Sequence, residues 1–78
     1  MGWNHRIMAH EHEGEIYLQV HEVYYNDAGV PNGCTENGIT VGADTMEGIQ
    51  WVLEKIEDCA SKPILWYGER FPEEYKEE

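Results

Sequence analysis

The sequence has little positive charge. Only five of its 78 residues are Lys or Arg, against sixteen Asp and Glu, and the formal net charge is −11. Nucleic-acid binding depends on Lys and Arg side chains that neutralise phosphates, so this composition argues against direct binding to DNA or RNA. A basic protein or a nucleoprotein complex is the partner that the charge favours.

Long apolar runs and cysteines are also scarce. No apolar segment approaches the ~20 residues needed to span a bilayer, and the first residues carry no apolar stretch typical of a signal peptide. The two cysteines, Cys34 and Cys59, are too few for a disulfide framework, and whether they pair stays open. We therefore expect a cytoplasmic protein, in the host cytoplasm if a phage encodes it.

Two stretches, residues 3–9 and 15–25, are rich in aromatic and β-branched residues. They are separated by a short polar segment that ends in Glu13-Gly14. This pattern predicts an antiparallel β-hairpin. If Glu13 and Gly14 form a two-residue turn, the numbers of paired residues sum to 27, so Ile7 faces Val20.

This register divides the hairpin side chains between two faces. The face that we expect to form the core carries Trp3, His5, Ile7, Ala9, Ile16, Leu18, Val20, Glu22 and Tyr24. The opposite face carries Arg6, Met8, His10, His12, Tyr17, Gln19, His21, Val23 and Tyr25. The second face is unusually apolar for a surface in water. Either the register is shifted by one residue and a helix packs there, or this face binds a partner or a second copy of the chain.

Turn-forming residues crowd positions 26–33 and predict a chain reversal into a short third strand between Asn32 and Val41. The hydrophobic period then becomes helical. Asp44 or Thr45 can cap the helix, and Glu47 would complete a capping box with Asp44. The helix is expected to end near Ser61, and its apolar residues fall within an arc of about 140°: Met46, Ile49, Val52, Leu53, Ile56, Cys59 and Ala60.

These elements predict an α+β fold. An N-terminal antiparallel hairpin extends to a three-stranded sheet, one amphipathic helix packs on one face, and residues 64–67 add a short C-terminal extended segment or strand. Residues 1–68 form the single domain, and residues 69–78 form an acidic tail that we expect to fray.

Three short motifs resemble those of a family of small bacterial and phage-borne proteins. They are Trp3-Asn4 with Arg6, the segment His21-Glu22-Val23-Tyr24-Tyr25, and Lys62-Pro63-Ile64-Leu65. Members of that family show a Trp-Asn-Tyr-Arg start, a His-Glu-Val-Tyr-Tyr strand and a Lys-Pro-Val-Leu close, so His5 departs from the pattern. The resemblance covers most of residues 3 to 65. It implies a hairpin-plus-helix domain and no catalytic residue.

The polar side of the predicted helix is the main candidate binding surface. It consists of Glu47, Gln50, Trp51, Glu54, Glu57 and Asp58. An exposed tryptophan can anchor an interface while carboxylates steer a basic partner toward it. A second acidic group, Glu11, Glu13 and Glu15, surrounds the hairpin turn. The alternative is that the tail folds back, so that Phe71 or Tyr75 covers Trp51 and the acids only maintain solubility.

Rows of carboxylates can also occupy a basic groove that normally holds DNA or RNA. In this respect the chain is similar in kind to phage inhibitors of CRISPR complexes. We therefore expect a small acidic interaction module that blocks a nucleic-acid-binding surface of its partner. The alternative from another class is a structural or regulatory bacterial protein that self-associates through its sheet.

Catalytic and metal sites have weak support. The only serine, Ser61, falls at the helix end, and the eight glycines form no phosphate-binding loop. We predict no enzymatic activity and no cofactor. His10 and His12 would project to one face of a strand, where Glu15 could add a third metal ligand, whereas His21 is expected to lie out of reach of His10.

Overall fold

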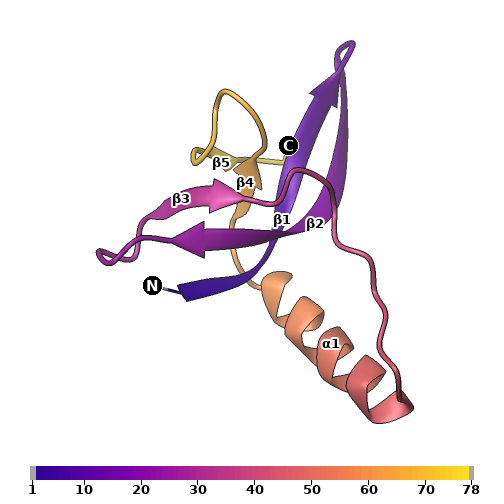
Figure 1. Ribbon diagram of the computed structural model, residues 1–78. Coiled ribbons are helices and arrows are strands. Elements are labelled where there is room, and N and C mark those ends of the chain that lie inside the picture. Colours follow the sequence, from indigo (N-terminus) through magenta and orange to yellow (C-terminus); the bar gives the residue numbers. More distant parts are fainter. Residues whose placement is uncertain (1, 78) are drawn as a thin grey trace.

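The computed structural model describes residues 2–77 and has an α+β fold, with one helix and a five-stranded mixed sheet (Figure 1). The elements are β1 (Gly2–His12), β2 (Glu15–Tyr25), β3 (Pro31–Cys34), α1 (Met46–Cys59), β4 (Ile64–Trp66) and β5 (Glu74–Tyr75). The strand order is β3-β2-β1-β4-β5, and only β1 and β4 run parallel. The fold class is confirmed.

The expectation of three strands was too low. The hairpin and a short third strand are present, but β4 pairs with β1 and β5 pairs with β4, which extends the sheet on its other edge. These two strands have three and two residues, too few to show the alternation of side chains that identifies a strand in a sequence.

The hairpin has the predicted register. Ile7 pairs with Val20, and all eleven pairs between β1 and β2 sum to 27. The turn residues Glu13 and Gly14 have φ angles of 53° and 83°. Positive φ at both central positions is what a type I′ turn requires, and the twist of that turn suits the right-handed twist of the two strands.

The assignment of the core face was wrong. Met8 and Val23, on the face expected to bind a partner or a second copy, are completely buried. They form the central cluster with Leu65 of β4. On the face expected to form the core, His5 and Ala9 are buried, but several large apolar side chains remain exposed: Trp3, Ile16, Leu18 and Tyr24.

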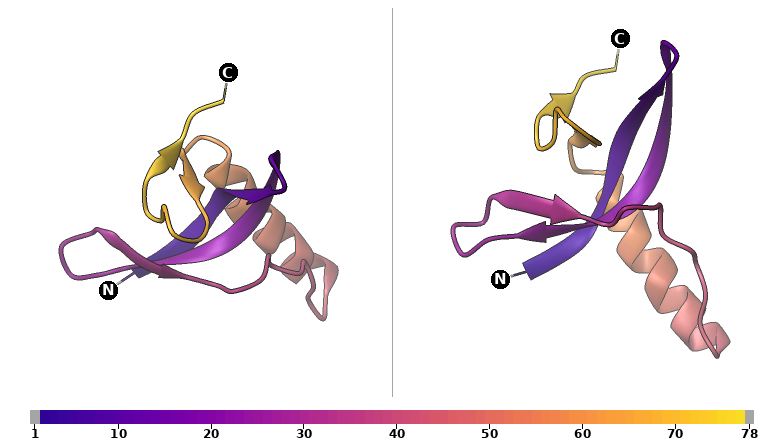
Figure 2. Two further views of the ribbon diagram at one scale, coloured as in Figure 1. Left: turned by 90° about the horizontal axis from the view of Figure 1, so that it is seen from above. Right: turned by 45° about the horizontal axis from the view of Figure 1, so that its top comes forward.

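The physical reason is that a segment distant in sequence covers the second face. Tyr67 and Phe71, which follow β4, pack against the Met8–Val23–Leu65 cluster together with Tyr25 and Cys34. Figure 2 shows the long, twisted strands of the hairpin and the loop after β4 beside them. Neither of the two alternatives considered for this face, a shifted register or a partner, is needed to explain its apolar residues.

The acidic tail does not fray in its described part. Phe71 packs against the core, and Tyr75 pairs with Ile64 in the sheet. The ring of Tyr75 also meets that of Trp66 edge to face, with centroids 5.0 Å apart. Apolar side chains between the carboxylates therefore hold residues 69–77 to the domain.

Helix α1 begins one residue later than the capping box would require. Thr45 is the N-cap, and its Oγ1 accepts a hydrogen bond from the Gly48 N–H at 3.1 Å. The third helical position is therefore Gly48, so the expected box between Asp44 and Glu47 is not formed.

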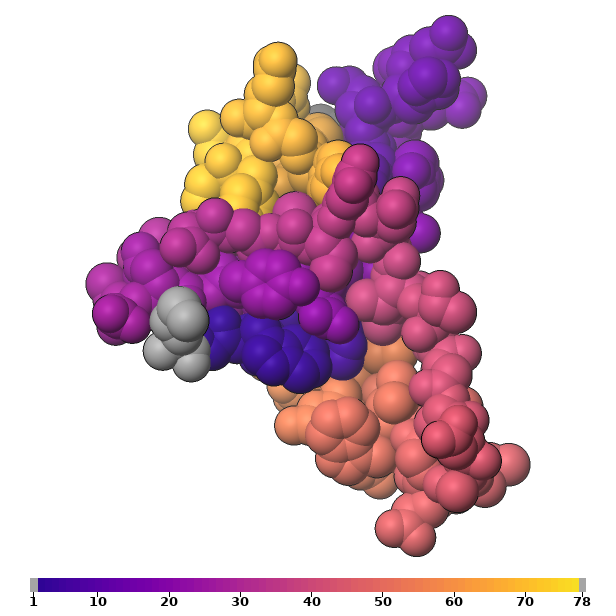
Figure 3. All heavy atoms as spheres, in the orientation of Figure 1, coloured from indigo at the N-terminus to yellow at the C-terminus, as the bar shows by residue number. Residues whose placement is uncertain are grey.

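Only the last part of α1 is buried. Cys59 is its single buried residue, whereas Met46 and Leu53 from the apolar arc are exposed. Figure 3 shows α1 and the loop before it projecting from the body of the sheet. The helix thus presents both its polar side and part of its apolar side to solvent. Within residues 2–77, no helix is long and apolar enough to cross a membrane.

Candidate functional site

The two predicted acidic surfaces lie at different ends of the molecule. Glu11, Glu13 and Glu15 surround the hairpin turn, and Figures 1 and 2 show α1 extending away from that turn. The two acidic groups thus do not form one continuous surface. The hairpin group and the helix group are therefore separate candidate sites, which can be altered independently.

The predicted stripe on α1 is present at the surface. All six of its residues are exposed: Glu47, Gln50, Trp51, Glu54, Glu57 and Asp58. The tail does not cover Trp51, which is 55% exposed, because Phe71 and Tyr75 pack elsewhere. The solubility-only alternative loses the contact on which it depended.

A pocket beside this stripe brings Trp51 together with Trp3 from the start of β1. We call it the Trp3–Trp51 pocket. It has a volume of about 240 Å³ and is lined by Trp3, Asn4, His5, Trp51, Lys55 and Asp58. Trp3 was expected to be a core residue, yet it is 51% exposed. Its place on the same strand face as His5 was visible in the sequence, but the position of α1 was not.

Contacts within the pocket are aromatic and ionic. The rings of Trp3 and His5 meet edge to face with centroids 5.4 Å apart, and Lys55 Nζ lies 5.3 Å from the centroid of the Trp51 ring. Asp58 Oδ2 accepts a hydrogen bond from Lys62 Nζ at 2.8 Å. This bond and the charge of Lys62 lower the pKa of Asp58, so its carboxylate is ionised near neutral pH.

A chain of hydrogen bonds joins one side of this pocket to the start of β4. The Tyr25 hydroxyl donates to Asn4 Oδ1 at 2.7 Å and accepts from the guanidinium of Arg6 at 2.8 Å. The buried Arg6 also donates to the carbonyl oxygen of Pro63 at 2.7 Å. These bonds connect β1, β2 and the turn that follows α1, and so orient the strand that carries Trp3.

The expectation that His21 lies out of reach of His10 was wrong. The two Nε2 atoms are 2.8 Å apart, although His10 pairs with Tyr17 and His21 pairs with Arg6 along the hairpin. The twist of the strands brings side chains from distant pair positions together on the covered face. The ring centroids are 5.0 Å apart, so the two rings meet nitrogen to nitrogen rather than face to face.

The histidine pair is continued by Thr35, in the loop after β3. His21 Nδ1 lies 3.1 Å from both the carbonyl oxygen and Oγ1 of Thr35. The carbonyl oxygen can only accept a hydrogen bond, whereas the hydroxyl can also donate one, so the tautomer of His21 decides which histidine donates across the Nε2–Nε2 contact. Burial lowers the pKa of both histidines, and for His21 this effect is opposed by the bond to Thr35.

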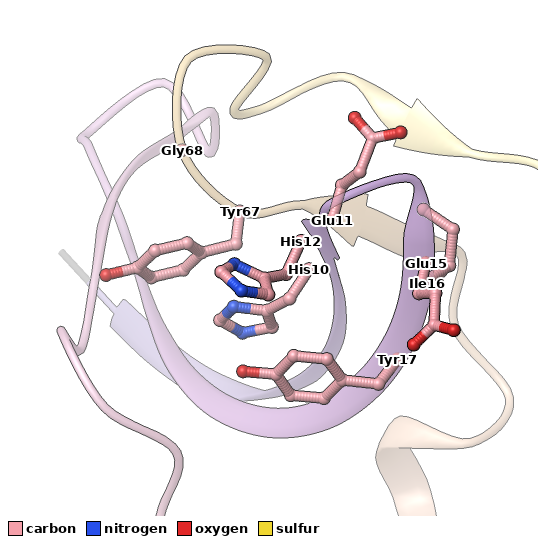
Figure 4. A pocket seen from close by; sticks show the side chains of 8 residues that line it. All are labelled: His10, Glu11, His12, Glu15, Ile16, Tyr17, Tyr67 and Gly68. Carbon is pink, nitrogen blue, oxygen red and sulfur yellow. The ribbon is translucent and has the colours of Figure 1, made fainter.

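Tyrosines enclose the same pair, as Figure 4 shows for His10. The ring of His10 stacks between those of Tyr17 and Tyr67, at centroid distances of 4.8 and 4.4 Å. These rings line a cavity of about 650 Å³ at the hairpin end, with the lining residues His10, Glu11, His12, Glu15, Ile16, Tyr17, Tyr67 and Gly68.

The weak metal candidates do not form a site. In the range 2–77, no group of three or more His, Cys, Asp or Glu side chains could hold a metal ion. His10 Nε2 contacts His21, and the exposed His12, which pairs with Glu15 along the hairpin, lies 3.9 Å from the carboxylate of Glu13. Cys34 and Cys59 are both free thiols, and burial raises the pKa of each.

No family model, curated protein or solved structure matches this chain. The helix stripe and the Trp3–Trp51 pocket form one continuous candidate surface, because Trp51 and Asp58 belong to both. Its chemistry is that of exposed indole rings surrounded by carboxylates, which suits recognition of a cation.

Proposed function

We propose that the protein is a small acidic interaction module without enzymatic activity. It binds a basic surface of a protein or nucleoprotein complex through the stripe on α1 and the Trp3–Trp51 pocket. The observation that carries this proposal is the exposure of Trp51 among carboxylates on a helix that buries only Cys59. Large aromatic side chains of this kind supply much of the binding energy at protein interfaces.

The charge supports an inhibitory role at a surface that normally holds nucleic acid. With a net charge of −11, the chain attracts basic grooves and repels phosphates. Carboxylates along α1 would compete with a phosphate backbone for the same Lys and Arg side chains. The proposed activity is thus similar in kind to that of phage inhibitors of CRISPR complexes.

A displacement experiment tests this function. A fluorescent DNA duplex is bound to a CRISPR effector complex, and the protein is added at increasing concentration in 50 mM and 300 mM salt. We expect displacement that weakens at the higher salt, because exposed charges are screened over shorter distances. Failure to displace at either salt concentration would contradict this activity for that effector, and equal displacement at both would contradict the electrostatic mechanism.

Two matched triple variants locate the surface. Glu47→Gln/Glu54→Gln/Glu57→Gln removes three charges from the helix, and Glu11→Gln/Glu13→Gln/Glu15→Gln removes three from the hairpin end. The two variants have the same net charge, so a difference between them reports position alone. We expect the helix variant to lose displacement and the hairpin variant to retain it. The reverse result would assign the interface to the hairpin turn.

Self-association is the second candidate function, and the outer face of the hairpin favours it. Ile16, Leu18 and Tyr24 are exposed there. Sedimentation velocity from 1 to 100 µM separates the candidates. A monomer throughout this range would exclude self-association at those concentrations. A dimer that Leu18→Ser dissociates would place the interface on the outer face.

A further inference from the structure

We propose that the Trp3–Trp51 pocket is an arginine-recognition site. A guanidinium group of the partner stacks on the indole rings of Trp3 and Trp51 and pairs with the carboxylate of Asp58. This inference rests on the proposed interaction function and names the side chain that the partner inserts.

The structure already shows a cation at this place. Lys55 Nζ lies 5.3 Å from the centroid of the Trp51 ring, within the range of a cation–π interaction. The same chain places the guanidinium carbon of Arg70 4.4 Å from the centroid of Trp66. The Trp51 ring therefore presents a face that a positive side chain can reach from solvent.

The lining also contains an anion, the carboxylate of Asp58. Asp58 is exposed, and its ionised state is maintained by Lys62, which approaches its Oδ2 atom. A partner cation that enters the pocket would meet this carboxylate and the other acids along α1. The acidic surroundings increase the local concentration of cations, and the indoles add the contact area that a carboxylate lacks.

Arginine fits this lining better than lysine. Its guanidinium is planar, stacks on aromatic faces and carries five N–H donors, one of which can bond the Asp58 oxygen that Lys62 does not occupy, whereas an ammonium is a compact and strongly hydrated charge. The volume of about 240 Å³ is on the scale of one large side chain. The pocket therefore admits a single residue of the partner rather than a segment of its backbone.

In the free protein, the ammonium group of Lys55 lies over the Trp51 ring, where the partner's guanidinium would stack. A partner arginine must displace it or share the ring with it. Removing the charge with Lys55→Gln should therefore tighten arginine binding, by roughly two- to fivefold if one exposed cation–π contact is relieved.

NMR titration with small probes tests the inference. The probes are Nα-acetyl-arginine methylamide, its lysine analogue and its neutral citrulline analogue, each at constant ionic strength. We expect the arginine probe to shift the indole N–H signals of Trp3 and Trp51 in a saturable way, at least fivefold more tightly than the lysine probe. The Trp66 signal is an internal control, because its ring already contacts Arg70.

Two variants test whether the indole ring of Trp51 and the carboxylate of Asp58 both contribute to binding of the arginine probe. Trp51→Ala should abolish the saturable shift at Trp3, and Asp58→Asn should weaken arginine binding at least threefold while the spectrum shows a folded chain. Equal binding of the citrulline probe, equal binding of the lysine probe, or a shift confined to Trp66 would each overturn the proposal.

The two proposals fail in different ways. If the arginine probe does not bind but the helix variant still loses DNA displacement, the arginine site is wrong and the interaction function stands. If the probe binds as expected but displacement fails, the pocket recognises arginine in a partner other than the tested nucleoprotein complex.

Discussion

His10 Nε2 and His21 Nε2 lie 2.8 Å apart, and His21 Nδ1 lies 3.1 Å from both the carbonyl oxygen and Oγ1 of Thr35. This contact joins β1 to β2 and, through Thr35, to the loop that follows β3. Tyr67 from the segment after β4 stacks on His10. This histidine pair thus connects four parts of the chain on the covered face of the hairpin.

The stability of the protein should fall as the pH falls from 8 to 5.5. Burial lowers the pKa of His10 and of His21, so the unfolded chain, with ordinary values near ~6.5, takes up protons that the folded chain resists. The free energy of unfolding, measured by urea denaturation at several pH values, should therefore decrease on acidification below about 6.5.

The histidine variants identify the source of this pH dependence. In His10→Gln/His21→Gln the slope between pH 8 and 5.5 should become smaller, whereas His12→Gln, a change at the exposed hairpin end, should leave the slope as in the natural chain. A slope that stays the same in the double variant would show that other groups cause the dependence.

The protonation pattern of the pair can be observed directly. We expect His21 to carry its proton on Nδ1 and His10 on Nε2 at pH 8, because the Thr35 carbonyl oxygen beside His21 Nδ1 can only accept, and Thr35 Oγ1 at the same distance can accept as well. Imidazole nitrogen chemical shifts in a ¹⁵N-labelled sample distinguish the two tautomers. A proton on Nε2 of His21 would contradict this expectation and would mean that Thr35 Oγ1 donates to Nδ1.

Thr45→Ala should destabilise the protein by about 1 kcal/mol, since it removes the side chain that accepts from the Gly48 N–H. Asp44→Ala is the matched control one residue earlier, and it should change stability by less than ~0.5 kcal/mol. Both values come from chemical denaturation at pH 7.5. A larger loss of stability in the Asp44 variant would contradict the assignment of Thr45 as the N-cap and would favour the capping box between Asp44 and Glu47.

Met8→Ala should cost about 2–5 kcal/mol, the usual range for truncation of a buried methionine. Ile16→Ala, on the opposite face of the hairpin, should cost less than ~1 kcal/mol because Ile16 is already 38% exposed. Equilibrium unfolding of both variants measures which face of the hairpin is the core. Similar losses would contradict the assignment of the core to the Met8 face.

Phe71→Ala and Trp51→Ala form the last matched pair. Phe71 packs against the core cluster, so its truncation should cost about 2 kcal/mol, below the ~3–5 kcal/mol of a fully buried Phe. Trp51 is more than half exposed, and its truncation should change stability by less than ~1 kcal/mol. A large loss of stability in Trp51→Ala would mean that the ring stabilises the fold, which would contradict its assignment to a binding surface.

The sequence by itself determined the hairpin, its register and the extent of the helix. The turn at Glu13-Gly14 imposes its pairing on β1 and β2, and helical periodicity from Met46 to Cys59 is visible without any neighbour. These features depend on residues close together in the chain, so short-range physical rules were sufficient.

Tertiary structure alone decided which hairpin face is buried and where the candidate site lies. Tyr67 and Phe71 cover the Met8 face, although they follow Met8 by 59 and 63 residues in the sequence. The placement of α1 likewise brings Trp51 to Trp3, and the twist of the strands brings His10 to His21. Each of these contacts depends on how distant segments pack against one another. The alternation of apolar residues in a strand and their period in a helix reflect only local structure, so they do not predict such contacts.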